Sequence, residues 1–190
     1  MTIKDKILII KQRLRLDMNG VASKSMRDGG IGYGLNFGVG LAALKEIAGE
    51  TEHDSSLAIA LWKENVRECK MLASMIYPAD EFPIELADMW VEEIEWPDLA
   101  QTCSMYLFSR MPEASVTAFR WIASQSEMVR YCGFLTIAHQ MRQGKEMNER
   151  YVTELRDQAQ TALADGCTLP ALAAQTVMDI LERNGNDGQN

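Results

Sequence analysis

A seven-residue phrase that occurs twice constrains the fold of this chain more than any other feature. The first copy, VRECKML, spans residues 66–72, and the second, VRYCGFL, spans residues 129–135. Each copy follows a tryptophan that closes an apolar helical run, and a looser third copy lies between them. Recurrence of a two-helix unit roughly every 30 residues is typical of stacked repeats, each of which buries its apolar face against its neighbours. We therefore predict an all-α chain folded as an antiparallel helical-repeat superhelix, an α-solenoid of about 9–11 helices.

Apolar periodicity and end signals place the individual helices. Asp54 and Asn65 are good N-caps, and Pro83, Pro97 and Pro112 suit the starts of later helices. The expected helices span residues 3–18, 41–48, 55–63, 66–77, 83–93, 97–110, 112–123, 127–143, 147–164 and 169–183.

A glycine-rich segment at residues 29–40 interrupts this pattern with six glycines. No P-loop motif follows it and no strand precedes it, so neither nucleotide-binding fingerprint has its required context. We expect a loop whose glycines adopt positive φ.

The length and composition suit one folded domain. At 190 residues the chain is long enough for a well-buried core, and we expect one domain over residues 1–184, a frayed tail at residues 185–190, and a monomer. Its apolar runs are too short for a membrane span, and four cysteines without a CxxC pair suit a reducing compartment. The expectation is a cytoplasmic protein with no membrane partner.

The net charge of −8 is unevenly distributed. Residues 1–27 hold seven bases and two acids, so residues 28–190 carry a net charge of −13. An acidic body argues against broad nucleic-acid affinity, because that affinity comes mainly from neutralising phosphates. The basic first helix leaves a local contact open.

Three cysteines fall at equivalent positions of successive repeats: Cys69, Cys103 and Cys132. Successive layers are about 10 Å apart, too far for three thiolates to share one metal. We predict small buried thiols, and no metal or cofactor.

Aromatic and polar residues also recur in register. Trp62, Trp90 and Trp121 end successive first helices and are expected to be packing residues, whereas Trp96 lies outside the register and is expected to be an exposed aromatic at a groove.

A polar position lies two residues before each cysteine, occupied by Arg67, Gln101 and Arg130. These three side chains are expected to lie either on a solvated face, where they form surface ion pairs, or in a groove that binds an anionic partner such as phosphate.

These features together resemble a known family. The matching segments are FGVGLAALKEIA at 37–48, LW at 61–62 with RECKMLA at 67–73, WVEE at 90–93, WPDL at 96–99 and VRYCGF at 129–134. In order and spacing over about residues 25–145, the chain resembles the AlkD-like DNA alkylation repair family. The resemblance implies HEAT-like repeats that hold duplex DNA in a concave groove, with no metal or cofactor. Active members of the family are glycosylases that remove 3- and 7-alkylated purines by hydrolysing the N-glycosidic bond.

The residues that carry the family's chemistry are altered in this chain. Aligned on Asp98, the family's catalytic carboxylate corresponds to Gln101; aligned on Trp96, it corresponds to Ala100. The catalytic arginine corresponds to Tyr131, and the last helix has no tryptophan. A carboxylate ~4 Å from a developing positive charge contributes about 4 kcal/mol at an effective dielectric near 20. Its loss slows the step by roughly a thousandfold.

The leading interpretation is a repair-family protein that binds DNA in its groove and has weak or lost glycosylase activity. Its family-equivalent catalytic region comprises Trp96, Asp98, Gln101, Arg130 and Tyr131, and its DNA-binding candidates are Lys45, Arg67, Lys70 and Arg130.

Two alternatives stay open. One is an active 3-/7-alkylpurine glycosylase that uses Asp98, Trp96 and Arg130. The other is a non-enzymatic helical scaffold that binds protein, favoured by the acidic body, by the acids of segment 92–98 and by twelve methionines.

Overall fold

Helix is the only regular secondary structure in residues 1–187, the part of the chain that the computed structural model describes. This part contains eleven α-helices, and its one β-type contact is an isolated parallel bridge between Leu35 and Val66. The all-α prediction is therefore confirmed. The chain divides into two compact units, Met1–Glu81 and Phe82–Asn190, so the single domain expected over residues 1–184 stays a prediction.

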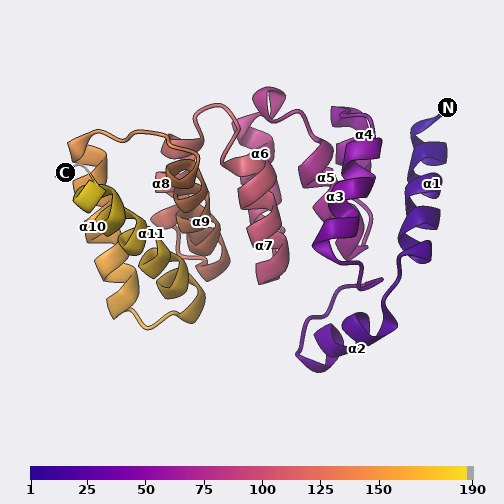
Figure 1. Cartoon of the computed structure of the whole chain (residues 1–190), viewed down its shortest axis with the longest axis horizontal. Helices are drawn as coiled ribbons and strands as arrows, with labels where there is room; N and C mark the ends of the chain where they lie inside the picture. The colour runs from indigo at the N-terminus through magenta and orange to yellow at the C-terminus, as the bar shows by residue number, and fades with distance from the viewer. Residues whose placement is uncertain (188–190) are drawn as a thin grey trace. The chain divides into compact units, whose positions relative to one another are not determined.

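The first unit is built around α5. Helices α3 and α4 both pack against α5, and α1 packs against α4. The Asp54 carboxylate accepts hydrogen bonds from the backbone N–H groups of Ser56 and Leu57, which confirms the predicted N-cap of α4. The elements are α1 (Ile3–Leu16), α2 (Gly20–Asp28), α3 (Leu41–Glu50), α4 (Ser55–Trp62), α5 (Arg67–Ile76) and the 3-10 turn η1 (Ala79–Glu81) (Figure 1).

The glycine-rich segment is a loop, as predicted, and it is held on the N-terminus of α5. Gly38 has φ +71°, and a Cβ there would collide with the backbone of Asn19. The buried Glu68 carboxylate accepts hydrogen bonds from the N–H groups of Phe37 (3.1 Å) and Val39 (3.2 Å). An acid in the first turn also complements the helix dipole. The Glu68 carboxylate thus holds the backbone of this glycine-rich loop in place.

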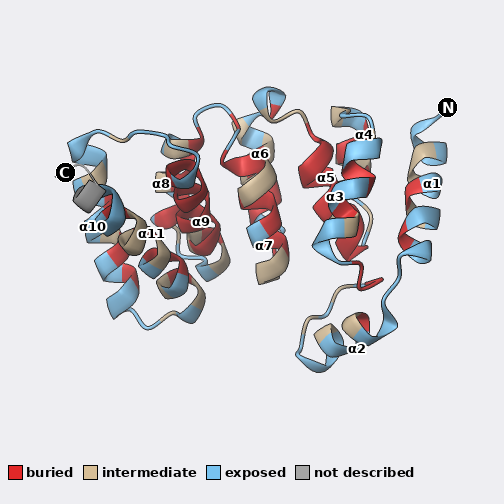
Figure 2. Ribbon diagram, viewed as in Figure 1, coloured by how far each residue is buried: buried red, intermediate tan, exposed pale blue. Residues whose placement is uncertain are grey.

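The second unit is built around α9, which packs against α8, α11, α7, η2 and α6. Figure 2 shows α9 as mostly buried, and residues 131–141 are buried without interruption. The α10 helix packs on α11. The elements are α6 (Ile84–Glu92), α7 (Pro97–Cys103), the π-helical segment η2 (Ser104–Phe108), α8 (Ala114–Ile122), α9 (Glu127–Arg142), α10 (Glu149–Ala164) and α11 (Thr168–Asp187).

Several predicted boundaries were wrong. Helix α2 was not expected, and Val66 rather than Asn65 is the N-cap of α5. The helix predicted over 97–110 changes to a π-helical segment at Ser104, and α11 extends to Asp187, into the tail that was expected to be frayed. The rest of that tail, residues 188–190, lies outside the described residues.

The repeated thiols and indoles are core residues, as predicted. Cys69, Cys103 and Cys132 are fully buried, and burial raises the pKa of Cys69 to about 12. Trp62, Trp90 and Trp121 are buried as well. The recurring phrase is therefore a packing signature.

Candidate functional site

A cavity of about 390 Å³ in the second unit brings together residues that the sequence had placed in one region. Three helical elements line it: α7 with its π-helical continuation, α9 and α11. Its lining residues are Gln101, Met105, Tyr131, Leu135, His139, Arg142, Leu172, Ala173 and Thr176.

The spacing of the lining residues on α9 follows helical geometry. Tyr131, Leu135, His139 and Arg142 are separated by four, four and three residues, which places them on one face. The π-helical segment supplies Met105 from the neighbouring element. Such segments occur frequently at functional sites.

One end of the cavity holds a neutral hydrogen-bonded pair. Gln101 Nε2 donates a hydrogen bond to Tyr131 Oη at 3.0 Å. Burial raises the pKa of the Tyr131 phenol, so this group stays protonated at neutral pH. The pair offers donors and acceptors but no charge.

The other end holds basic groups that the sequence analysis missed. His139 is 8% exposed, and Arg142 is exposed beside it on the same face of α9. Burial, together with the charges of Arg142 and Arg110, lowers the pKa of His139 to about 4. The regular spacing from Tyr131 along α9 is the signal that could have found His139 and Arg142.

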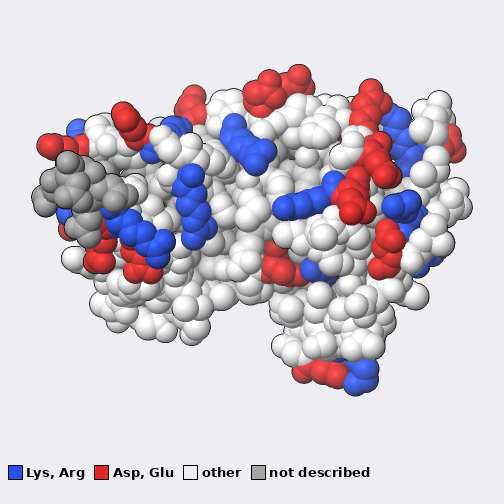
Figure 3. All heavy atoms as spheres, viewed as in Figure 1, with Lys and Arg blue, Asp and Glu red and all other residues white. Residues whose placement is uncertain are grey.

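The cavity is free of acids in an acidic unit. Residues 82–190 contain sixteen acids and eight bases, yet none of the nine lining residues is acidic. Figure 3 shows basic side chains over α9 and α11, with acidic side chains beside them over α10 and α11 and along the edge of this unit. The local charge therefore differs in sign from that of the unit as a whole, and it suits an anionic ligand.

Comparison with known proteins identifies the family. The family model described as DNA alkylation repair enzyme matches residues 10–167. The chain belongs to this DNA alkylation repair family. A similar solved structure is reported as a new family of proteins related to the HEAT-like repeat DNA glycosylases, with affinity for branched DNA structures. It matches with a TM-score of 0.83 and 17% identity over 95% of this chain and 76% of that one, which confirms the HEAT-like repeat fold. No curated protein matches the chain.

Within the alkylation repair fold, the other predicted site residues of the second unit are not among the residues that line the cavity. Arg130 Nη2 is 3.0 Å from a carboxylate oxygen of Asp165. The Asp98 carboxylate accepts a hydrogen bond from the Leu99 N–H at 2.9 Å, within the first turn of α7. Trp96 is half-buried and is the N-cap residue of that helix. The structure therefore joins Gln101 to Tyr131. Asp98, Trp96 and Arg130 are not among the lining residues, and their catalytic role stays a prediction.

The predicted DNA-binding residues of the first unit have varied surroundings. Arg67 is 7% exposed; its Nη1 lies 3.1 Å from a carboxylate oxygen of Glu68 and also donates a hydrogen bond to the Val39 carbonyl at 3.2 Å. Lys70 Nζ lies 4.8 Å from the ring centroid of Trp62. Lys45 is exposed on α3. Arg67 thus supports the fold, and phosphate contacts from these three residues stay a prediction.

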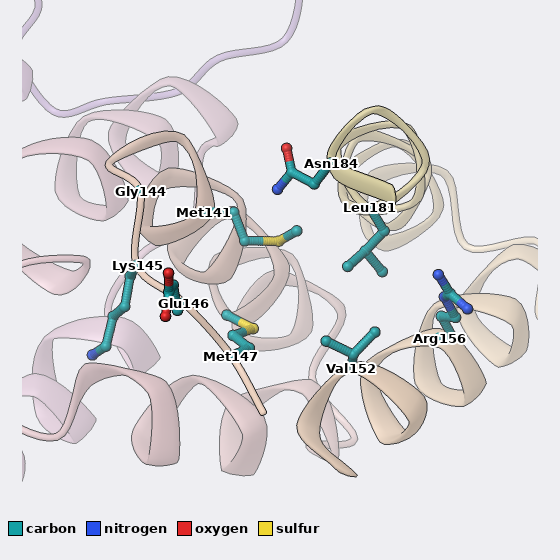
Figure 4. A pocket seen from close by; sticks show the side chains of 9 residues that line it. All are labelled: Met141, Gly144, Lys145, Glu146, Met147, Val152, Arg156, Leu181 and Asn184. Carbon is teal, nitrogen blue, oxygen red and sulfur yellow. The ribbon is translucent and has the colours of Figure 1, made fainter. Parts of the chain in front are cut away.

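A second cavity, of about 410 Å³, opens near the end of α9 (Figure 4). Met141, Met147, Val152 and Leu181 form its apolar lining, with Lys145, Glu146 and Arg156 among the polar lining residues. Because Arg156 is an exposed arginine of the same unit that lines a different cavity, it provides a matched control for charge substitutions at the first cavity.

The described side chains, those of residues 1–184, include no group of three or more His, Cys, Asp or Glu arranged to hold a metal ion. None of the helices described is both long and apolar enough to cross a bilayer.

The depressed pKa of His139 predicts a pH-dependent stability. The unfolded chain binds a proton near pH 6.5 that the folded chain binds only near pH 4, so the free energy of unfolding falls as the pH falls through this window. After allowance for solvent in the open cavity, we expect a loss of about 1 kcal/mol between pH 7 and pH 5. Urea unfolding of the wild type and of His139→Gln at both pH values measures it. Equal losses in the two proteins would contradict this assignment.

Proposed function

We propose that the chain binds DNA on the face of α7, α9 and α11 and has weak or no glycosylase activity. The observation that carries this proposal is the hydrogen bond between Gln101 and Tyr131. In the active members that the chain resembles, a carboxylate and an arginine are expected at these two positions. Membership of the alkylation repair family supports DNA as the ligand.

The neutral pair explains why excision should be lost. Cleavage of an alkylpurine nucleoside develops positive charge on the sugar, which a nearby carboxylate stabilises. An amide and a phenol supply only dipoles, and no acid lines the cavity. The missing charge is worth about 4 kcal/mol, or roughly a thousandfold in rate.

Branched DNA is the ligand class that we favour. The solved relative has affinity for branched DNA, and the fold it shares covers nearly all of this chain. The acid-free face offers a local anion site, whereas the net charge of −8 opposes extensive, non-specific contact with duplex DNA. A small basic face therefore suits a ligand with a defined shape better than a long uniform duplex.

Direct binding measurements test the DNA-binding part. We expect the full chain to bind a fluorescently labelled four-way junction more tightly than a duplex of the same length. Affinity should fall as salt is raised from 50 to 200 mM, because phosphate contacts release counterions. Undetectable binding to both DNAs at the lower salt would refute DNA binding and favour the protein-binding scaffold.

Base release tests the enzymatic part. Duplex DNA that contains 7-methylguanine is incubated with the protein, and the free base is quantified against DNA alone. We expect no release above the spontaneous rate. Release that is lost in Asp98→Asn and retained in Gln101→Ala would instead establish the alternative glycosylase built on Asp98.

A further inference from the structure

The basic end of the cavity contains an arginine and a neutral histidine with no acid among the lining residues. Arg142 and His139 line the cavity from α9, and the charge of Arg110, in the turn after η2, also acts on His139. Among the side chains of residues 1–184, neither Arg142 nor His139 has an ion-pair partner. By contrast, Arg120 and Arg130 of the same unit are paired with Asp88 and Asp165.

The surroundings of His139 make this cluster sensitive to an added anion. From α9 it is faced by Arg142, and from the turn after η2 by Arg110. From α7 and α11 the cavity is faced by the uncharged Gln101, Leu172, Ala173 and Thr176, and the other titratable group in it is Tyr131. No carboxylate therefore offsets the two arginines on the cavity side.

We propose that His139 and Arg142 bind one phosphodiester group of the DNA strand, and that His139 takes up a proton when that phosphate binds. This inference rests on the proposed DNA binding and specifies which end of the cavity holds the backbone. The guanidinium of Arg142 offers a planar set of donors that matches two phosphate oxygens. A phosphate at the cavity mouth supplies the negative charge that the cluster lacks, so it stabilises the imidazolium of His139.

Proton uptake makes the affinity depend on pH in a defined direction. Free His139 titrates near pH 4, and a bound phosphate that restores its ordinary value near 6.5 links binding to protonation. Between pH 7.5 and pH 5.5, DNA affinity should then rise by about tenfold from this residue.

The test uses anisotropy of a labelled four-way junction with the full chain at both pH values and constant ionic strength. From pH 7.5 to pH 5.5, the dissociation constant of the wild type should fall by about tenfold more than that of His139→Gln. Because every other titratable group is the same in the two proteins, this difference isolates His139. Arg142→Ala should reduce the slope of log affinity against log salt concentration by about one, the value for one released counterion. The matched control Arg156→Ala should leave this slope unchanged.

The outcomes separate this inference from the proposed function. If wild type binds DNA but His139→Gln keeps the same pH dependence, or Arg142→Ala keeps the wild-type salt dependence, the phosphate cluster is refuted and DNA binding stands. If the wild type binds no DNA at either pH, both proposals fail. A circular dichroism spectrum identical to wild type confirms that each variant is folded.

Discussion

Replacing Glu68 with alanine is expected to lower the free energy of unfolding by about 3–5 kcal/mol, the range typical of breaking a buried ion pair. Glu68 is fully buried, and its carboxylate contacts the Arg67 guanidinium and two backbone N–H groups of the glycine-rich loop. Alanine removes the Glu68 counter-charge from the Arg67 guanidinium and the carboxylate acceptor from two amides. Each unsatisfied buried group costs about 1–3 kcal/mol. Urea unfolding followed by circular dichroism measures the loss.

A matched control distinguishes this role from a general effect of removing an acid. Glu52 forms an exposed ion pair with Lys6, so Glu52→Ala should change stability by less than about 1 kcal/mol. If Glu68→Ala is as stable as Glu52→Ala, the carboxylate does not hold the loop. Limited proteolysis gives a second readout, because a released glycine-rich segment should be cleaved faster between residues 29 and 40 in Glu68→Ala alone.

Glu68 also illustrates what the sequence could and could not predict. The repeat period, the buried cysteines and the packed tryptophans follow from local pattern, because each repeat has the same packing to satisfy. The attachment of the loop to α5 joins residues about thirty positions apart, and no local propensity encodes it. Another contact of this loop explains why Asn65 was wrongly predicted as the N-cap of α5. The Asn65 carbonyl accepts a hydrogen bond from the Leu35 N–H, and the next residue, Val66, forms the bridge with Leu35.

The candidate site was predictable in part for a similar reason. The family register placed Gln101 and Tyr131 at equivalent catalytic positions, and the structure places their side chains 3.0 Å apart. Arg67 was expected in a groove because its position matches that of Arg130, but its neighbour Glu68 draws it into a buried pair. His139 and Arg142 were missed because they lie beyond the repeated phrase. These two residues line a cavity only because α7, η2 and α11 pack around α9, and such non-local contacts are not encoded in the local sequence.

Replacing Gly133 with alanine is expected to lower the free energy of unfolding by about 2 kcal/mol, although alanine is the better helix former. Gly133 is the residue in the second copy of the repeated phrase that corresponds to Lys70 in the first. A Cβ at this position would lie 2.8 Å from the Ala118 carbonyl oxygen and 2.9 Å from the Ile122 backbone nitrogen. Both atoms belong to the backbone of α8, so α8 and α9 must separate to admit the methyl group.

This separation should also weaken DNA binding, because α9 carries the cavity residues Tyr131, His139 and Arg142 on its opposite face. Urea unfolding and junction affinity are measured on the same preparation, with Gly49→Ala as the control. Gly49 lies within α3, and a Cβ there meets no atom within 4 Å, so alanine should raise stability by about 0.5–1 kcal/mol. A Gly133→Ala protein that gains stability as Gly49→Ala does would show that the α8–α9 packing is looser than the structure gives. Loss of stability with unchanged affinity would show that the binding determinants lie elsewhere on the chain.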